Sequence, residues 1–133
     1  MKELPMIRGI FVVAGLYDGL VGVAFLLAAP MLYAKLNIPP PNHWAYIHFI
    51  SLLLIIFGLM FLAVAANPLR NANLILFGIL LKFAYFGTVF YHWWAGGIPN
   101  LWKPFAFIDV ACAVVFVWAY AVLRQKNRAA AVI

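Results

Sequence analysis

The stretch FGILLKFAYFGTVFYHWW, from Phe77 to Trp94, has the length and apolar character of a membrane-spanning helix. Such a helix needs about 20 mainly apolar residues to cross about 30 Å of hydrocarbon. This one also carries Lys82 near its middle and His92 near its end. An ionisable group at the bilayer centre costs at least about 3 kcal/mol, so it normally faces other helices and pairs there. The stretch therefore predicts a membrane helix packed inside a bundle, with polar partners on its neighbours.

The composition of the whole chain agrees with the membrane class. Of the 133 residues, 68% are hydrophobic and 9% are charged, whereas a soluble domain is about half apolar and about a quarter charged. The formal net charge is +6, but the basic residues lie at the ends of apolar runs instead of forming one basic face. We therefore expect the lipid bilayer as a partner and no nucleic acid.

Four apolar runs are long enough to cross a membrane, and turn-forming stretches separate them. The separating stretches are IPPPN (38–42), NPLRN (67–71) and GGIPN (96–100). The predicted fold is an all-α integral membrane four-helix bundle. It forms a single transmembrane domain over residues 1–133, with spans at about residues 7–29, 43–66, 73–94 and 104–123.

The basic residues predict an orientation for this bundle. Both termini and the 67–73 turn lie on one side, which holds six basic residues: Lys2, Arg8, Arg70, Arg124, Lys126 and Arg128. The loops expected at 30–42 and 95–103 lie on the other side and hold only Lys35 and Lys103. The positive-inside rule then predicts that the N- and C-termini are cytoplasmic and that the two loops face outward.

The two halves of the chain show a partial internal similarity. NHWAYIHFIS (42–51) resembles NLWKPFAFID (100–109), and Gly9 to Pro30 has the same spacing as Gly78 to Pro99. Duplication of a two-span unit would produce this pattern, and the bundle would then be two pseudo-repeated helical hairpins. The alternative is that Trp and Asn recur because both favour membrane interfaces. Both explanations stay open at this point.

Polar groups near the centre of the predicted bundle suggest an ion pair. Asp18 lies roughly 16 Å and Lys82 roughly 13 Å from the cytoplasmic ends of their spans, at about 1.5 Å per residue. We expect these two side chains to pair across the bundle, with hydroxyl groups added by Tyr17 and Tyr85. One interpretation is a ligand site or proton relay, and the other is a structural pair that fixes helix register.

A second polar group is expected nearer the outer surface. His48, His92 and Asp109 all fall roughly 3–8 Å below it, on three different spans. We expect them to form one cluster above the central pair, so that the two levels line a cleft open to the outside. His48 and His92 are also candidate ligands of a haem between the second and third spans. The alternative for these histidines is ordinary hydrogen bonding at the interface.

Other cofactor and enzyme motifs are missing from the sequence. Neither HExxH nor CxxCH occurs, and the one cysteine, Cys112, excludes an internal disulfide and a cysteine metal cluster. No glycine-rich phosphate loop or nucleophile motif is present. The sequence therefore does not predict an enzyme, and the cofactor, if there is one, stays unknown.

In size and layout the chain resembles the small bacterial four-helix membrane proteins of the DoxX-like type. The features that carry the resemblance are Arg8-Gly9 at the start of the first span, Gly58 in the second, the NPLRN turn, and the aspartate of FID (107–109). The resemblance implies a multi-pass protein of the bacterial inner membrane. No cysteine set supports the oxidoreductase association of some such proteins, and no site residue is transferred from them.

Three functions fit these observations. The first is an accessory subunit, or a module that binds an apolar ligand such as a lipid, quinone or pigment, in a membrane complex with other subunits or further copies of the chain. The second is an oligomeric proton-coupled or small-molecule transporter that uses Asp18, Lys82 and Asp109. The third is a small haem or metal protein that uses His48 and His92.

Overall fold

The computed structural model describes residues 2–132 and contains four helices. They are α1 (Glu3–Lys35), α2 (Ala45–Ala66), α3 (Ala72–Ala95) and α4 (Trp102–Val132). No strand occurs in residues 2–132, so the predicted all-α four-helix bundle is confirmed. All four helices are long and apolar enough to cross a membrane, which supports a multi-pass membrane protein.

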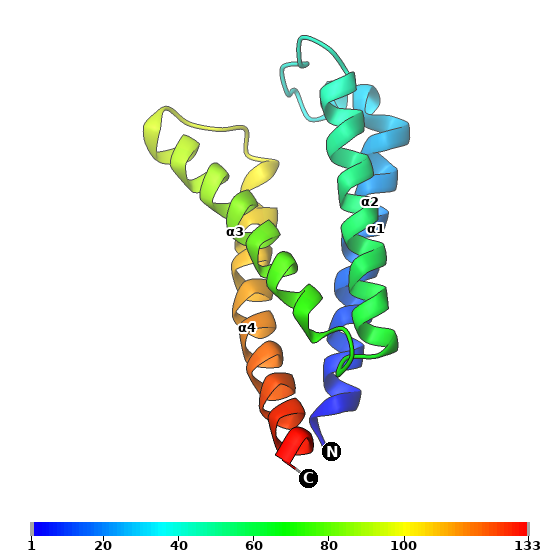
Figure 1. Cartoon of the computed structure of the whole chain (residues 1–133). Helices are drawn as coiled ribbons and strands as arrows, with labels where there is room; N and C mark the ends of the chain where they lie inside the picture. The colour runs from blue at the N-terminus through cyan, green and yellow to red at the C-terminus, as the bar shows by residue number, and fades with distance from the viewer. Residues whose placement is uncertain (1, 133) are drawn as a thin grey trace.

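The chain forms two helical hairpins, α1 with α2 and α3 with α4 (Figure 1). Both termini and the α2–α3 turn lie at one end of the bundle, which we call the terminal end. The α1–α2 and α3–α4 connections lie at the other, which we call the loop end. The hairpins meet at the terminal end and diverge toward the loop end, so the molecule has the outline of a V (Figure 1).

The α1–α2 hairpin is packed closely enough for the two backbones to touch. A Cβ atom added to Gly58 would lie 2.8 Å from the carbonyl oxygen of Gly15, and one added to Gly22 would lie 2.7 Å from that of Ser51. Helices in a membrane associate through such small residues, because lipid is as apolar as the side chains and van der Waals packing must hold them together. The first hairpin is thus a tightly packed unit.

The α1 helix is longer than the first predicted span, and this corrects the expected loop over residues 30–42. Residues from Pro30 to Lys35 are helical, and the distortion falls two residues earlier, where Ala28 has φ −134° and ψ 18°. Proline has no N–H to donate and its ring clashes with the preceding turn, so it kinks a helix unless it begins a new one. The sequence signal was therefore a kink, and the chain leaves the helix only after Lys35.

A tightly packed apolar core fills the terminal end. Its centre is three phenylalanine rings from three helices: Phe11 stacks on Phe116 at 4.7 Å between centroids, and Phe61 meets Phe116 edge-on at 5.2 Å. All three side chains are buried. This three-ring core joins the two hairpins.

Polar contacts also hold the terminal end together. The Asn71 side chain donates a hydrogen bond to the carbonyl of Ala63 at 2.8 Å, which ties the α2–α3 turn to α2. The C-terminal part of α4 is joined to the rest by a 3.1 Å salt bridge from Lys126 to Glu3. These contacts add to the three-ring core in holding the terminal end together.

Candidate functional site

Three charged side chains from three helices meet where the hairpins begin to separate. The Lys82 Nζ atom on α3 donates hydrogen bonds to both carboxylate oxygens of Asp18 on α1, at 3.0 and 3.2 Å. The same Nζ lies 3.2 Å from Oδ1 of Asp109 on α4. We call this group the triad. The predicted pairing of Asp18 with Lys82 is confirmed.

The predicted grouping of Asp109 with two histidines is wrong. His48 is half-buried, His92 is exposed, and residues 2–132 contain no group of three His, Cys, Asp or Glu side chains close enough to hold a metal. The helix α4 begins at Trp102, so Asp109 lies about 10 Å along it from the loop end. That depth is within reach of the long side chain of Lys82, which therefore binds two carboxylates at once.

The triad is almost entirely shielded from solvent. Asp18 is 2%, Lys82 1% and Asp109 6% exposed. Two rings lie against the ammonium group, since the centroids of Tyr17 and Phe61 are each 5.6 Å from Nζ. A charge can be buried in this way only when it is paired and hydrogen-bonded, and the triad meets this condition for the lysine.

A cleft of about 540 Å³ leads to the triad from between the two hairpins. Its walls are apolar apart from the triad and a few hydroxyl groups, and this volume lies in the range of small-molecule sites. The aromatic part of the lining is formed by Tyr17, Phe25, Tyr33, Tyr85, Trp102 and Phe105. The aliphatic part is formed mainly by Val21, Ile47, Ile50, Leu53, Leu54, Leu81 and Val89.

Trp102 joins the two hairpins beside this cleft. Its ring lies 5.8 Å from that of Phe25 and 6.0 Å from that of Tyr33, both on α1. Its carbonyl accepts a 3.0 Å hydrogen bond from the hydroxyl of Tyr85. From the sequence Trp102 looked like one more interfacial tryptophan, so its role in the site was missed. Trp94, which is 86% exposed, fits the interfacial role.

Ser51 is a second residue of the cleft that the sequence did not single out. It is 1% exposed, and its hydroxyl donates a hydrogen bond to the carbonyl of Ile47 at 2.7 Å. The signal that points to it is the internal similarity of the chain, in which Ser51 aligns with Asp109. Both residues line the same cleft, one from each hairpin.

The three-ring core closes the site toward the terminal end. Phe61 lies against Lys82 Nζ on one side and packs on Phe116 and Phe11 on the other. Its ring also lies over Gly78, where an added Cβ would come within 2.5 Å of it. The three-ring core and the triad therefore form the boundary of the cleft on the side of the terminal end.

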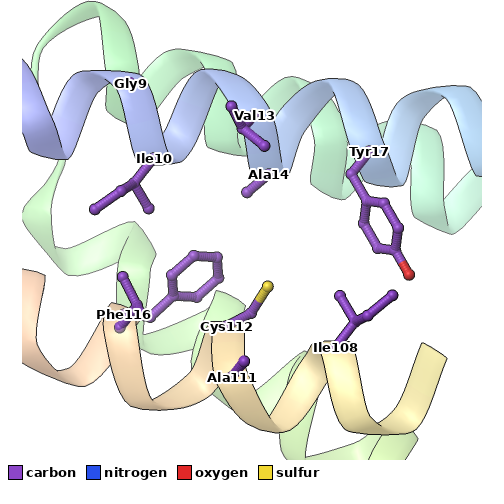
Figure 2. Close-up of a pocket in the computed structure, with 10 residues that line it drawn as sticks. Gly9, Ile10, Val13, Ala14, Tyr17, Ile108, Ala111, Cys112 and Phe116 are labelled. Carbon is purple, nitrogen blue, oxygen red and sulfur yellow. The ribbon is translucent and has the colours of Figure 1, made fainter. Parts of the chain in front are cut away.

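A second hollow lies between α1 and α4 and has a volume of about 510 Å³. Figure 2 shows Ile10, Val13 and Ala14 of α1 facing Ile108 and Cys112 of α4 across it, with Tyr17 at one end. This hollow has no charged lining. Tyr17 lines both hollows and so stands between them.

No protein-family model, curated protein or solved structure matches this chain. The chemistry of the site therefore has to follow from its own residues. The triad can bind a cation or a hydrogen-bond donor, and its carboxylates can take up or release a proton. The apolar walls above it can hold a hydrocarbon or aromatic body.

Proposed function

We propose that this protein binds an amphipathic small molecule in the cleft, with the polar group of the ligand at the Asp18–Lys82–Asp109 triad. The observation that carries the proposal is an ion triad at the closed end of a cleft with apolar and aromatic walls. A buried ion pair is a poor way to stabilise a fold, since apolar residues of the same volume often do so better. A cavity beside it lowers stability further. The combination is better explained by a ligand.

The distribution of basic residues supports an orientation in which the termini are cytoplasmic. The resemblance to DoxX-like proteins favours a bacterial inner membrane as the location. The cleft then opens in the outer half of the bilayer. Ile50, 53% exposed, and the exposed Thr88 belong both to its lining and to the outer surface of the bundle. A lipid-soluble ligand can therefore enter sideways, between α2 and α3.

An amphipathic ligand agrees with the predicted binding of an apolar compound such as a lipid or quinone. The proposal adds that the polar group of the ligand contacts the charged side chains of the triad. Association with other membrane subunits, or with further copies of the chain, stays a prediction. Neither His48 nor His92 lines the cleft, so a haem held by these two histidines would be a separate site and stays a prediction.

Filling the cleft is expected to remove the bound ligand. Ala84 lines the cleft at its exposed rim, so the indole of Ala84→Trp would fill the mouth of the cleft beside the triad. Native mass spectrometry of protein released in mild detergent should show an amphiphile bound to the wild type and lost from this variant. The matched control is Phe83→Trp at the next position, which is 51% exposed and lies outside the cleft lining.

Equal ligand occupancy in Ala84→Trp and Phe83→Trp would place the ligand elsewhere. A wild type that binds no small molecule from its native membrane or from added amphiphiles would remove the proposal altogether. Circular dichroism of both variants shows whether they keep their helices, so that lost binding is not confused with unfolding.

A carrier is the second candidate function, and one observation favours it. The three-ring core closes the cleft toward the terminal end, whereas the lining residues Ile50 and Thr88 are exposed on the other side of the triad. Access from one side only is one of the two states that alternating access requires. In liposomes, Asp18→Asn is then expected to abolish flux of the bound amphiphile. Flux that is unchanged by Asp18→Asn contradicts a role of the triad in transport. A wild type that binds the amphiphile without moving it is a binding module only.

A further inference from the structure

We infer that the ligand of the cleft is an amphipathic amine, whose positively charged nitrogen replaces a proton at Asp109. The inference rests on the proposed function and names the class of compound that the same site takes. Three observations lead to it: the charge of the triad, the unequal exposure of its members, and the aromatic walls.

The charge of the triad is the first observation. Two carboxylates and one ammonium group give a formal charge of −1, and no other charged residue of the described chain (2–132) lines the cleft. An uncompensated charge in an apolar environment is costly, and such groups are neutralised by a proton or a counter-ion. One proton therefore neutralises the triad when no ligand is bound, and one cation neutralises it when the ligand is bound.

The unequal exposure of the two carboxylates shows where that cation goes. Lys82 donates hydrogen bonds to both oxygens of Asp18, whereas its contact with Asp109 is to one oxygen, Oδ1. The side chain of Asp109 is 9% exposed, compared with 3% for Asp18 and 2% for Lys82. A carboxylate oxygen can accept more than one hydrogen bond. Asp109 is therefore the carboxylate with capacity left for an N–H group arriving through the cleft.

The aromatic walls are the third observation. The ring centroids of Tyr17 and Phe105 lie 6.3 Å apart beside the triad. Tyr85 and Trp102 continue the aromatic wall toward the loop end. Ring faces attract cations, and Lys82 itself already uses two of them. An anionic amphiphile would meet a surplus carboxylate in place of a partner. A neutral alcohol would leave the proton on Asp109 and would gain no ion pair there.

The groups that face Asp109 limit which proton is exchanged. They are Asp18 and Tyr17 on α1, Lys82 and Tyr85 on α3, and Cys112 one turn further along α4, while α2 contributes only the hydroxyl of Ser51. Of these, only the two carboxylates and the lysine change the charge balance of the triad. When a protonated amine binds, Asp109 loses its proton to water at the exposed side of the cleft, beside Ile50 and Thr88. Its carboxylate then pairs with the ammonium, and no bond to carbon changes.

Calorimetry with three probes of equal chain length tests this inference. Octylamine, octanol and octanoate are titrated into the wild type in lipid nanodiscs, with empty nanodiscs subtracted. Octylamine is expected to bind at least about tenfold more tightly than octanol, and octanoate no better than octanol. Repeating the octylamine titration in two buffers of different ionisation enthalpy should show net proton release on binding.

The variant Asp109→Asn keeps the size of the side chain and makes the triad formally neutral. Its affinity for octylamine is expected to fall to that for octanol, and proton release should disappear. The matched control is Glu3→Gln. Glu3 is the third acidic side chain of the sequence and lies at the terminal end, away from the triad, so this variant should change neither result. The proton release of the wild type needs no variant, so the test holds even if Asp109→Asn folds poorly.

The possible failures separate the two proposals. If octylamine and octanol bind equally well and both are lost in Ala84→Trp, the cleft binds amphiphiles and the inference of an amine is overturned. Octylamine binding without proton release overturns the exchange at Asp109. If none of the three probes binds, the proposed function itself fails, and the inference falls with it.

Discussion

The variant Lys82→Met is expected to lower the free energy of unfolding by about 3–5 kcal/mol, the range measured when one member of a buried ion pair is removed. The methionine fills nearly the same space, so the loss would come from charge. Asp18 and Asp109 would then face each other without a cation, in a site where they are 2% and 6% exposed. Unfolding in mixed micelles of increasing denaturing detergent, followed by helical circular dichroism, measures this loss.

Two further variants show whether charge is the cause. Adding Asp18→Asn and Asp109→Asn to Lys82→Met removes the unpaired carboxylates and should restore most of the lost stability. The control Lys35→Met changes an exposed lysine at the loop end and should have little effect. If the triple variant is no more stable than Lys82→Met, the lysine contributes by packing, and the electrostatic explanation is wrong.

The second large effect is expected from Gly58→Ala. The new methyl group would lie 2.8 Å from the carbonyl oxygen of Gly15 and 2.9 Å from the nitrogen of Gly19. Both are backbone atoms, so the contact can be relieved only by moving α1 and α2 apart. Overpacking of this kind typically costs about 1–3 kcal/mol, measured in the same unfolding experiment.

The matched control for this change is Gly87→Ala on α3. A Cβ there has no neighbouring atom within 4 Å, so the variant should keep its stability or gain up to about 1 kcal/mol from better helix propensity. A Gly58→Ala protein that behaves like Gly87→Ala would mean that the two backbones of the first hairpin do not touch.

The sequence was sufficient for the helices and for one contact of the site. Apolar runs, breakers and their lengths predicted the four helices, because a membrane span must satisfy its backbone groups internally. Counting residues from the ends of the spans also placed Asp18 level with Lys82, and the two do pair. The depth of a residue along a straight helix can be calculated from the sequence alone, by counting residues from the end of the span.

The partner of Asp109 could not be found in the same way. Depth says nothing about the direction in which a side chain points, and helix rotation is set by packing against the neighbours. The divergence of the hairpins and the start of α4 at Trp102 shift the levels further. Pro30 was misread for a related reason, since proline marks a kink in α1 as readily as a helix end.

The cleft itself lies beyond what the sequence shows. It exists because the hairpins are joined by the three-ring core at one end and separate toward the other, with Trp102 between them. Three aromatic residues of the cleft lining are Phe25, Tyr33 and Trp102. Each is an ordinary residue for a membrane span and its interface. Phe25 and Tyr33 lie on opposite sides of the kink at Ala28, so the periodicity of a straight helix does not place them beside each other.

Photo-crosslinking with a diazirine-bearing alkylamine tests most directly whether an amphiphile occupies the cleft next to the triad. After illumination in nanodiscs, mass spectrometry of peptides locates the attachment. We predict adducts on the lining residues Leu54, Leu81 and Tyr85, and their loss in Ala84→Trp but not in Phe83→Trp. Adducts confined to lipid-facing residues such as Leu80, with the same yield in all three proteins, would contradict binding in the cleft.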